Sequence, residues 1–407
     1  MTERLYYKDS HLLKFDARVV SVAADADGRA FVVLDRTAFY PTGGGQPFDT
    51  GALGRARVVE CVEAEDAGVL HVVEGEAPEP GARVTGLVDW PRRLDHIQQH
   101  TGQHILSQAF VELYGAQTRS FRMMSDACEI DVDLGDPSDE KIERAVGRAN
   151  EVVWEDRAVR VHNVTPEEAA RLPLRKDTAR EGGLRVIEIE GFDFSPCGGT
   201  HAHRTGEVGM IAARGWERAK GLVRVTFVAG TRALADYRRA NRTARAVASL
   251  FSVARDEAAD AAARLQDENK QLLRRLRSAE ELAARAEARE LVEEADKESG
   301  GEEREGGARI VARVFDGRDA EELRRLAHAL VAHAGTVALL GSTDAGGARL
   351  VFARSTDAGA DMNALMRAAC LALGGRGGGR PDMAQGGGPL ADKLPGVIED
   401  AARALRA

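Results

Sequence analysis

Two short segments constrain this chain more than any other feature: His-Thr-Gly-Gln-His at residues 100–104 and Cys-Gly-Gly-Thr-His at residues 197–201. The first lies in an apolar pattern typical of a helix, and its i, i+4 spacing places both imidazoles on one helical face. In the second, two glycines let the backbone turn tightly, so the thiol and the imidazole can approach one point. Imidazole nitrogen and thiolate sulfur are the donors that Zn²⁺ binds in tetrahedral sites. The fold is therefore expected to bring two distant segments together around one ion.

Each segment alone has a simpler explanation. Two histidines four residues apart on an amphipathic helix are more often a packing pair than a metal site, and a cysteine beside two glycines is usually a packing residue. Their presence in one chain favours the metal site. No glutamate follows His100, so the pair does not match the H-E-x-x-H pattern of zinc proteases, whose glutamate is the general base.

Length and composition set the class of protein. At 407 residues with 43% hydrophobic residues, the chain is long enough for several domains with real cores. Its four cysteines are far apart and form no C-x-x-C pair, which fits a reducing compartment. No apolar run approaches the length of a membrane span, and residues 1–10 do not resemble a secretion signal. We therefore expect a cytoplasmic protein without membrane contact.

The hydropathy pattern predicts an α+β chain of four parts. Residues 1–90 alternate apolar and polar positions between glycine-rich turns, which predicts a small β-barrel. Residues 91–233 mix strands and amphipathic helices and form the α+β core that carries the metal motifs. Residues 234–297 contain neither proline nor glycine, which predicts a long helix or helical hairpin with a coiled-coil-like seam. Residues 298–407 alternate strands and helices and predict a C-terminal α/β domain.

Several local features refine these parts. The stretch 298–309 is rich in glutamate and glycine and is expected to be a linker. The glycine-rich stretch 374–388 precedes the last helix, where free N–H groups would suit phosphate, with Arg376 and Arg380 adding positive charge. It lacks the Lys-Ser/Thr of a P-loop, so nucleotide hydrolysis is not expected. The buried face of one predicted helix is formed by Ile142, Ala145, Val146, Ala149, Val152 and Val153.

The motifs resemble one family when they are taken in order. Phe-Tyr-Pro-Thr-Gly-Gly-Gly-Gln-Pro at 39–47, the two metal motifs, Thr-Gly-Glu-Val-Gly at 205–209 and the glycine-rich stretch near the C-terminus all contribute. This order resembles the alanyl-tRNA editing proteins of AlaX type in their long form. These proteins are similar to the editing and C-terminal parts of alanyl-tRNA synthetase. The resemblance implies a last domain similar to the DHH-associated domain, and no aminoacylation activity.

The resemblance also implies roles for individual residues. The zinc ligands would be His100, His104, Cys197 and His201, with His203 as a rival for the last position. The loop that approaches the aminoacyl end of the tRNA would contain Gly43, Gly44, Gly45 and Gln46. Thr50, Gln46 and Ser120 would be the catalytic residues, with Thr50 reading a hydroxyl of the substrate and Ser120 lining the pocket. Arg376 and Arg380 would contact the tRNA.

The implied activity is trans-editing, the hydrolysis of the ester that joins serine or glycine to tRNA(Ala). Zinc would be the cofactor, mischarged tRNA(Ala) the partner, and a second copy of the chain a further partner through the C-terminal domain or the helical linker. Two alternatives stay open at this point. One is a zinc-stabilised tRNA-binding module without catalysis, and the other is a hydrolase of a different mischarged tRNA.

Overall fold

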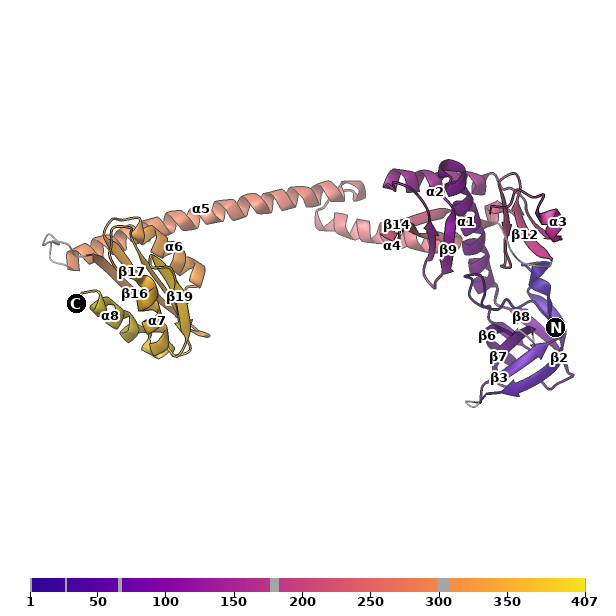
Figure 1. Ribbon diagram of the computed structural model, residues 1–407, viewed down its shortest axis with the longest axis horizontal. Coiled ribbons are helices and arrows are strands. Elements are labelled where there is room, and N and C mark those ends of the chain that lie inside the picture. The colour runs from indigo at the N-terminus through magenta and orange to yellow at the C-terminus, as the bar shows by residue number, and fades with distance from the viewer. Residues whose placement is uncertain (1, 26–27, 65–67, 176–182, 299–307, 407) are drawn as a thin grey trace. The chain divides into compact units, whose positions relative to one another are not determined.

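The computed structural model describes residues 2–25, 28–64, 68–175, 183–298 and 308–406. The chain divides into two compact units, Met1–Val247 and Ala248–Ala407, which are described separately below. Each unit combines helices with sheets (Figure 1), which confirms the predicted α+β class. The finer division into four domains remains a prediction.

A closed barrel forms the beginning of the first unit, with strand order β2-β3-β7-β6-β5-β8. Its strands are β2 (Lys14–Ala24), β3 (Ala30–Leu34), β5 (Gly51–Leu53), β6 (Ala56–Ala64), β7 (Gly68–Glu74) and β8 (Arg83–Val88). Along β2 the buried side chains are Phe15, Ala17 and Val19, at every second position, because successive side chains of a strand point to opposite faces. Beside the barrel, the short strands β1 (Glu3–Arg4) and β4 (Arg36–Thr37) pair in parallel, and the 3-10 turn η1 spans Leu5–Tyr7.

Helix α1 (Trp90–Tyr114) leads from the barrel into the rest of the first unit. A four-stranded sheet has the order β14-β15-β10-β9, and a three-stranded sheet has the order β11-β12-β13. The strands are β9 (Thr118–Met123), β10 (Cys128–Val132), β11 (Val159–Val164), β12 (Leu184–Ile189), β13 (Asp193–Pro196), β14 (Ile211–Ala219) and β15 (Leu222–Ala229). The other helices are α2 (Asp139–Trp154), α3 (Pro166–Ala169), the 3-10 turn η2 (Thr205–Val208) and α4 (Gly230–Leu250).

Helix α2 begins and packs as its sequence predicts. Ser138 accepts a hydrogen bond from the backbone N–H of Lys141, and Asp139 and Glu140 lie in the first turn, where acidic side chains stabilise a helix. All six residues predicted for the buried face are buried. Among their neighbours in the core are Ile105 and Phe110 of α1.

A buried ion pair joins the barrel to α1. Arg93 of α1 and Asp49, just before β5, are both fully buried and bind each other through two guanidinium nitrogens. Arg93 also donates to the carbonyl oxygens of Ser10 and Ala38, each at 2.6 Å. A buried charge is tolerated when its hydrogen-bonding capacity is used, as it is here. The guanidinium therefore fixes the start of α1 against two loops of the barrel.

The second unit is a three-layer arrangement around a five-stranded sheet of order β16-β17-β18-β20-β19. Its elements are η3 (Arg255–Glu257), α5 (Ala258–Glu298), β16 (Arg309–Asp316), α6 (Ala320–Val331), β17 (Thr336–Asp344), β18 (Gly347–Arg354), α7 (Met362–Ala372), β19 (Arg376–Gly379), β20 (Met383–Gly388), η4 (Ala391–Lys393) and α8 (Leu394–Ala404). One core lies between the sheet and α5 with α6, and the other between the sheet and α7 with α8.

The glycine-rich stretch 374–388 differs from its prediction, because it forms β19 and β20 rather than a loop before a helix. Strand β20 pairs with β18 on one side and β19 on the other, so its backbone N–H and C=O groups form hydrogen bonds within the sheet. A Cβ at Gly377 would lie 2.5 Å from the Cys370 sulfur of α7. Glycine is therefore needed because α7 packs directly on the backbone of these strands.

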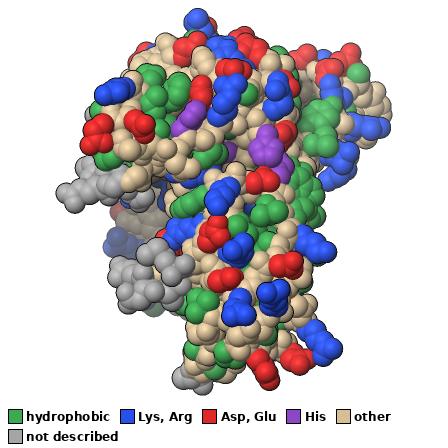
Figure 2. Space-filling model, turned by 90° about the vertical axis from the view of Figure 1, so that its right-hand side faces the viewer, with side chains coloured by type: hydrophobic (Ala, Val, Ile, Leu, Met, Phe, Trp, Pro, Cys, Tyr) green, Lys and Arg blue, Asp and Glu red, His purple; other side chains and the backbone are tan. Residues whose placement is uncertain are grey.

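The stretch predicted to be one long helix or a helical hairpin forms two helices, α4 and α5, with η3 directly before α5. Leu265, Leu272 and Leu276 of α5 follow the heptad spacing of the predicted seam, and they are 54%, 58% and 54% exposed. Most of the predicted linker, residues 299–307, lies outside the described residues. Among the helices that the structure describes, none has both the length and the apolar composition that crossing a bilayer requires. On the face in Figure 2, acidic and basic side chains are interspersed.

Candidate metal centre

Four of the predicted ligand residues come together in the first unit. His100 and His104 lie one turn apart on α1, and Cys197 and His201 lie just after β13. One ligand atom from each side chain lies within 4.8 Å of the corresponding atoms of the other three. All three histidines are buried, and Cys197 is partly exposed. His203, the rival candidate, is not part of this group.

Gln46 orients the first of these imidazoles. Its Oε1 lies 2.8 Å from Nδ1 of His100 and also accepts from the backbone N–H of Thr200 at 3.2 Å. Its Nε2 donates to the hydroxyl of Thr200 at 2.9 Å, which fixes the amide so that Oε1 faces the ring. The His100 Nδ1 therefore carries the proton, and Nε2 keeps a free lone pair. Gln46, for which the resemblance implies a catalytic role, contacts the candidate centre through His100.

The Nδ1 atoms of the other two imidazoles also face oxygen atoms, although that of His104 forms no hydrogen bond among the described residues. Nδ1 of His201 lies 3.3 Å from the hydroxyl of Thr101, and Nδ1 of His104 lies 3.4 Å from Oδ2 of Asp193. Asp193 is itself held by Arg175, whose Nε donates to Oδ1 at 2.9 Å. Metal-binding histidines usually direct their second ring nitrogen to such an acceptor.

The sulfur of Cys197 completes a donor set that fits zinc. It lies 3.3 Å from Nε2 of both His100 and His201. Tetrahedral bonds of about 2.3 Å to sulfur and about 2.0–2.1 Å to nitrogen would separate these atoms by about 3.6 Å. Burial alone would raise the pKa of the thiol, but His100 and His201 outweigh it and hold that pKa well below its ordinary value. Burial also lowers the pKa of His201 to about 3. A thiolate and neutral imidazoles are the forms that bind a metal ion.

Glycine is required at two close approaches around this centre. A Cβ at Gly199 would lie 2.2 Å from Cε1 of His100, so only glycine lets the turn after Cys197 pass the ring. Gly45 has a φ of +83°, and a Cβ there would lie 2.7 Å from the carbonyl oxygen of Phe121. The loop therefore lies against β9, where the N–H of Met123 donates to the carbonyl of Gly45 at 3.0 Å.

A cavity of about 810 Å³ opens beside the four side chains. His100, His104 and Cys197 form part of its wall. Of the other predicted residues, Gly44 and Ser120 also line it. The Ser120 hydroxyl donates to Asp131 at 2.7 Å and can still accept a hydrogen bond. The cavity is large enough for a ligand of the size of an aminoacyl nucleoside.

Arg185 of β12 also lines the cavity, although no local sequence pattern predicted it as a site residue. Its Nη1 donates to the carbonyl oxygens of Cys197 at 2.7 Å and Gly199 at 3.0 Å, and its guanidinium lies over the ring of Tyr7. Its Nη2 is buried and has no hydrogen-bond partner among the described residues. Burial lowers the pKa of Arg185, although Cys197 partly offsets this effect. Arg185 holds the turn between two ligand residues and brings a positive charge to the cavity.

The remaining predicted residues lie elsewhere. Thr50 is not among the residues that line the cavity, and its hydroxyl donates to Asp89 at 2.6 Å, at the start of α1. Gly43 forms a tight turn with Gln46. Arg376 is the first residue of β19 in the second unit, and Arg380 directly follows that strand. Arg380 forms an exposed ion pair with Asp382 at 3.3 Å.

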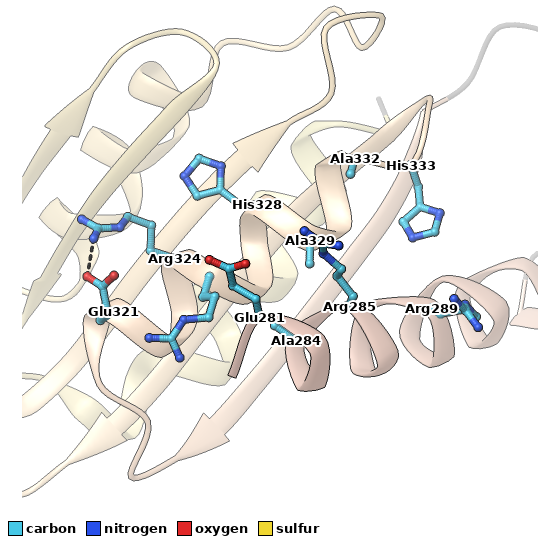
Figure 3. A pocket seen from close by; sticks show the side chains of 11 residues that line it. Glu281, Ala284, Arg285, Arg289, Glu321, Arg324, His328, Ala329, Ala332 and His333 are labelled. Atoms are coloured by element: carbon cyan, nitrogen blue, oxygen red, sulfur yellow. Dashed lines mark hydrogen bonds and ion pairs between the residues drawn. The ribbon is translucent and has the colours of Figure 1, made fainter. Parts of the chain in front are cut away.

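A second cavity, of about 820 Å³, lies between α5 and α6 in the second unit (Figure 3). Its basic side chains are Arg285, Arg289, Arg324, Arg325, His328 and His333. Arg324 pairs with Glu321, and Arg325 pairs with Glu280. Arg285 and Arg289, one turn apart on α5, have no ion-pair partner within the described part of the chain. We call this cavity, with the six basic side chains that line it, the α5–α6 groove.

Comparisons with known proteins cover both units. Family models match residues 2–92 (tRNA synthetases class II (A)), 184–226 (Threonyl and Alanyl tRNA synthetase second additional domain) and 306–407 (DHHA1 domain). The second match contains Cys197 and His201.

Two curated proteins represent the relatives. The alanyl-tRNA editing protein AlaX-L of Pyrococcus horikoshii is 39% identical over 243 residues, which are 58% of this chain and 59% of that protein. The alanine–tRNA ligase of Pyrobaculum neutrophilum is 34% identical over 409 residues, which are 95% of this chain and 42% of the ligase. The crystal structure of the C-Ala domain from Aquifex aeolicus alanyl-tRNA synthetase aligns at 30% identity over 24% of this chain and 91% of that chain, with a TM-score of only 0.23.

This chain thus spans less than two thirds of the length of the two curated relatives. The matches nevertheless extend over most of its own residues and include both the metal centre and the C-terminal sheet domain. The chain is therefore a relative of the alanyl-tRNA editing proteins of AlaX type in their long form, and of the alanine–tRNA ligases.

Proposed function

We propose that this protein hydrolyses the ester that joins a wrong amino acid, serine or glycine, to tRNA(Ala). The observation that carries the proposal is the buried group of three imidazoles and one thiol in the wall of the cavity of about 810 Å³. The relationship to AlaX-L supports the choice of substrate. A synthetase site for alanine cannot strongly reject an added hydroxyl, so serine is the error that needs a second, hydrolytic site.

We infer that the metal is zinc and that His100, His104, Cys197 and His201 hold it. Zinc bound there supplies Lewis acidity toward an ester carbonyl or a water molecule. The protein keeps the four side chains in place through Gln46 and the other acceptors of the Nδ1 atoms. Positioning is a large part of the task, because an aminoacyl ester is already labile and gains rate when it is held in the reactive geometry.

The cavity residues have distinct parts in this proposal. Arg185 holds the backbone between Cys197 and His201 and provides a positive charge with an unused N–H group. Gly44 leaves room for the aminoacyl end to approach the backbone, and Ser120 offers a hydrogen-bond acceptor on the cavity wall. Thr50 is the weakest of the expected substrate contacts, because its hydroxyl is engaged by Asp89.

Deacylation of four substrates tests the activity: Ser-tRNA(Ala), Gly-tRNA(Ala), Ala-tRNA(Ala) and Ser-tRNA(Thr). We expect hydrolysis of the first two, with the correctly charged tRNA largely spared. Equal rates on the serine and alanine esters of tRNA(Ala) would contradict editing. Preferred cleavage of Ser-tRNA(Thr) would favour a hydrolase of another tRNA.

Variants connect the activity to the centre. His104→Ala should abolish both hydrolysis and stoichiometric zinc, whereas His162→Ala should change neither, because His162 lies on β11 and pairs with Glu188. A protein that binds zinc and tRNA but hydrolyses none of the four substrates would be the non-catalytic binding module.

The second unit supports two further proposals about partners. We infer that it contacts tRNA phosphates, through either the arginines at β19 or the α5–α6 groove. The half-exposed leucines of α5 also support self-association through this helix. Sedimentation of the wild-type protein and of a Leu265→Ser, Leu272→Ser variant tests the second proposal, and an unchanged oligomeric state would contradict it.

A further inference from the structure

A second cluster of metal-binding side chains lies next to the main centre. Asp9 and His11, between η1 and β2, meet His203 and Glu207, which lie before and within η2. One ligand atom from each of Asp9, His11 and His203 lies within 4.8 Å of the others. None of these residues is assigned a part in the proposed hydrolysis.

The contacts within this cluster are specific. His203 Nε2 lies 3.2 Å from Oδ1 of Asp9, and His11 Nε2 lies 2.9 Å from Oε2 of Glu207. The two imidazoles stack with their centroids 3.9 Å apart and an angle of 30° between their planes. Asp9 is further ordered by the backbone N–H of His11, which donates to Oδ1 at 2.8 Å.

In the described part of the chain, neither carboxylate of the cluster has a permanently charged partner. Asp9 and Glu207 have no lysine or arginine as an ion-pair partner within the described residues. The nearby Arg204 pairs with Asp156 instead. The Nδ1 atom of His11 is buried and has no hydrogen-bond partner in the part of the chain that the structure describes. A divalent cation would neutralise both carboxylates and use the spare lone pairs of the rings.

We propose that Asp9, His11 and His203 form a second binding site for a divalent transition metal such as Zn²⁺, with Glu207 beside them as a supporting carboxylate. Mixed imidazole and carboxylate donors suit this class of ion, whereas Ca²⁺ and Mg²⁺ prefer oxygen alone. The side chains of Asp9 and His203 are 49% and 57% exposed, so metal from solution can reach the site. Without the thiolate of the main centre, the second site binds more weakly.

Binding there also acts on the main centre. Ser10 lies between two ligands of the second site, and its hydroxyl accepts a hydrogen bond from the backbone N–H of His201 at 3.1 Å. The second ion therefore clamps the segment around residue 10 onto the segment that carries His201. Because only the folded chain joins these segments, a bound ion stabilises the fold by mass action.

Zinc titration of the full chain by calorimetry, with elemental analysis after dialysis, tests the proposal. We expect one tight equivalent and one weaker equivalent in the wild type. His11→Ala with His203→Ala should remove the weaker equivalent and keep the tight one. Glu207→Gln should weaken the second equivalent about 10- to 100-fold, as loss of a coordinating or supporting carboxylate does. His162→Ala is the matched control and should retain both.

Two results would overturn the proposal. The first is a single zinc equivalent in the wild type at saturating metal. The second is a weaker equivalent that persists in the double histidine variant. Retention of the tight equivalent and of the circular dichroism spectrum shows that each variant is folded. The test measures metal binding and not hydrolysis, so its result can be interpreted even if the protein lacks the proposed activity.

Discussion

Oε1 of Gln46 lies 2.8 Å from Nδ1 of His100, although 54 residues separate them in the chain. One comes from the loop between the barrel strands and the other from α1. The contact fixes which ring nitrogen is free to bind a metal ion. In the proposed zinc site, a side chain outside the four ligand residues therefore decides whether one of them can bind. It also explains why the glycines before Gln46 are useful, because they let this loop lie against β9.

Replacing Gln46 tests this contact. Gln46→Leu removes the acceptor from His100 Nδ1 and should weaken zinc binding about 10- to 100-fold, the usual effect of losing such a partner. Competition with a chromogenic chelator measures the affinity. Gln46→Glu keeps an oxygen acceptor and should stay close to the wild type. Equal affinities for Gln46→Leu and the wild type would show that the His100 ring is held by other contacts.

The tRNA contact of the second unit can be assigned by salt dependence. If the α5–α6 groove binds phosphates, Arg285→Ala with Arg289→Ala should lower tRNA affinity and flatten its log–log salt slope by about 0.7–0.9 per lost contact. If the arginines at β19 bind instead, Arg376→Ala with Arg380→Ala should have that effect. Arg403→Ala, on α8 and paired with Asp400, is the control. No change of slope in either double variant would place the RNA elsewhere.

The barrel contains a histidine that makes stability depend on pH. His71 is fully buried between the hydroxyl of Thr37 and the carbonyl of Val32, and burial lowers its pKa from 6.5 to about 4. Below pH 6.5, His71 takes up a proton in the unfolded chain but stays neutral in the folded barrel. Stability is therefore full above pH 6.5 and falls by about 3 kcal/mol as the pH drops to about 4.

Urea unfolding at several pH values measures this effect. His71→Gln should remove about 3 kcal/mol of the pH dependence. His162→Gln, at a more exposed position, should leave the curve unchanged. Parallel curves for His71→Gln and the wild type would mean that other groups cause the loss of stability.

Two glycines of the second unit differ in whether they tolerate an added Cβ atom. A Cβ at Gly377 would lie 2.5 Å from the Cys370 sulfur and 2.8 Å from Cα of Gly386. Gly377→Ala should therefore destabilise the second unit by about 1–3 kcal/mol, the usual cost of overpacking. At Gly396, in α8, a Cβ meets no atom within 4 Å, so Gly396→Ala should stabilise by about 1 kcal/mol.

Hydrogen exchange of amides in α7 and α8 reports on this unit directly. A harmless Gly377→Ala would show that α7 does not pack on the strands as described. A destabilising Gly396→Ala would show that the space beside this position of α8 is occupied.

The metal centre was predictable because its residue types and local spacing determine where the side chains point. His100 and His104 had to share a helical face, and the predicted helix is present as α1. The buried face of α2 followed from periodicity in the same way. The choice between His201 and His203 did not follow, because both lie in one loop and only tertiary contacts separate their directions.

Features that depend on contacts between distant elements were not predictable. Arg185 carries no local signal, since its role comes from the turn twelve residues later that packs beside it. Glycines at 375–388 suggested a loop, because their lack of side chains favours flexibility locally. The sheet uses the same property differently, since it admits the close approach of α7.

The buried guanidinium of Arg93 limits how this protein can be dissected. A fragment that begins after the barrel would keep the arginine and lose Asp49, Ser10 and Ala38, which bind it. An uncompensated buried charge costs about 3–5 kcal/mol, a large share of the stability of a typical domain. Gene fusions and domain transplants should therefore carry residues 1–90 together with α1, because the two parts are separable in sequence but not as independent folding modules.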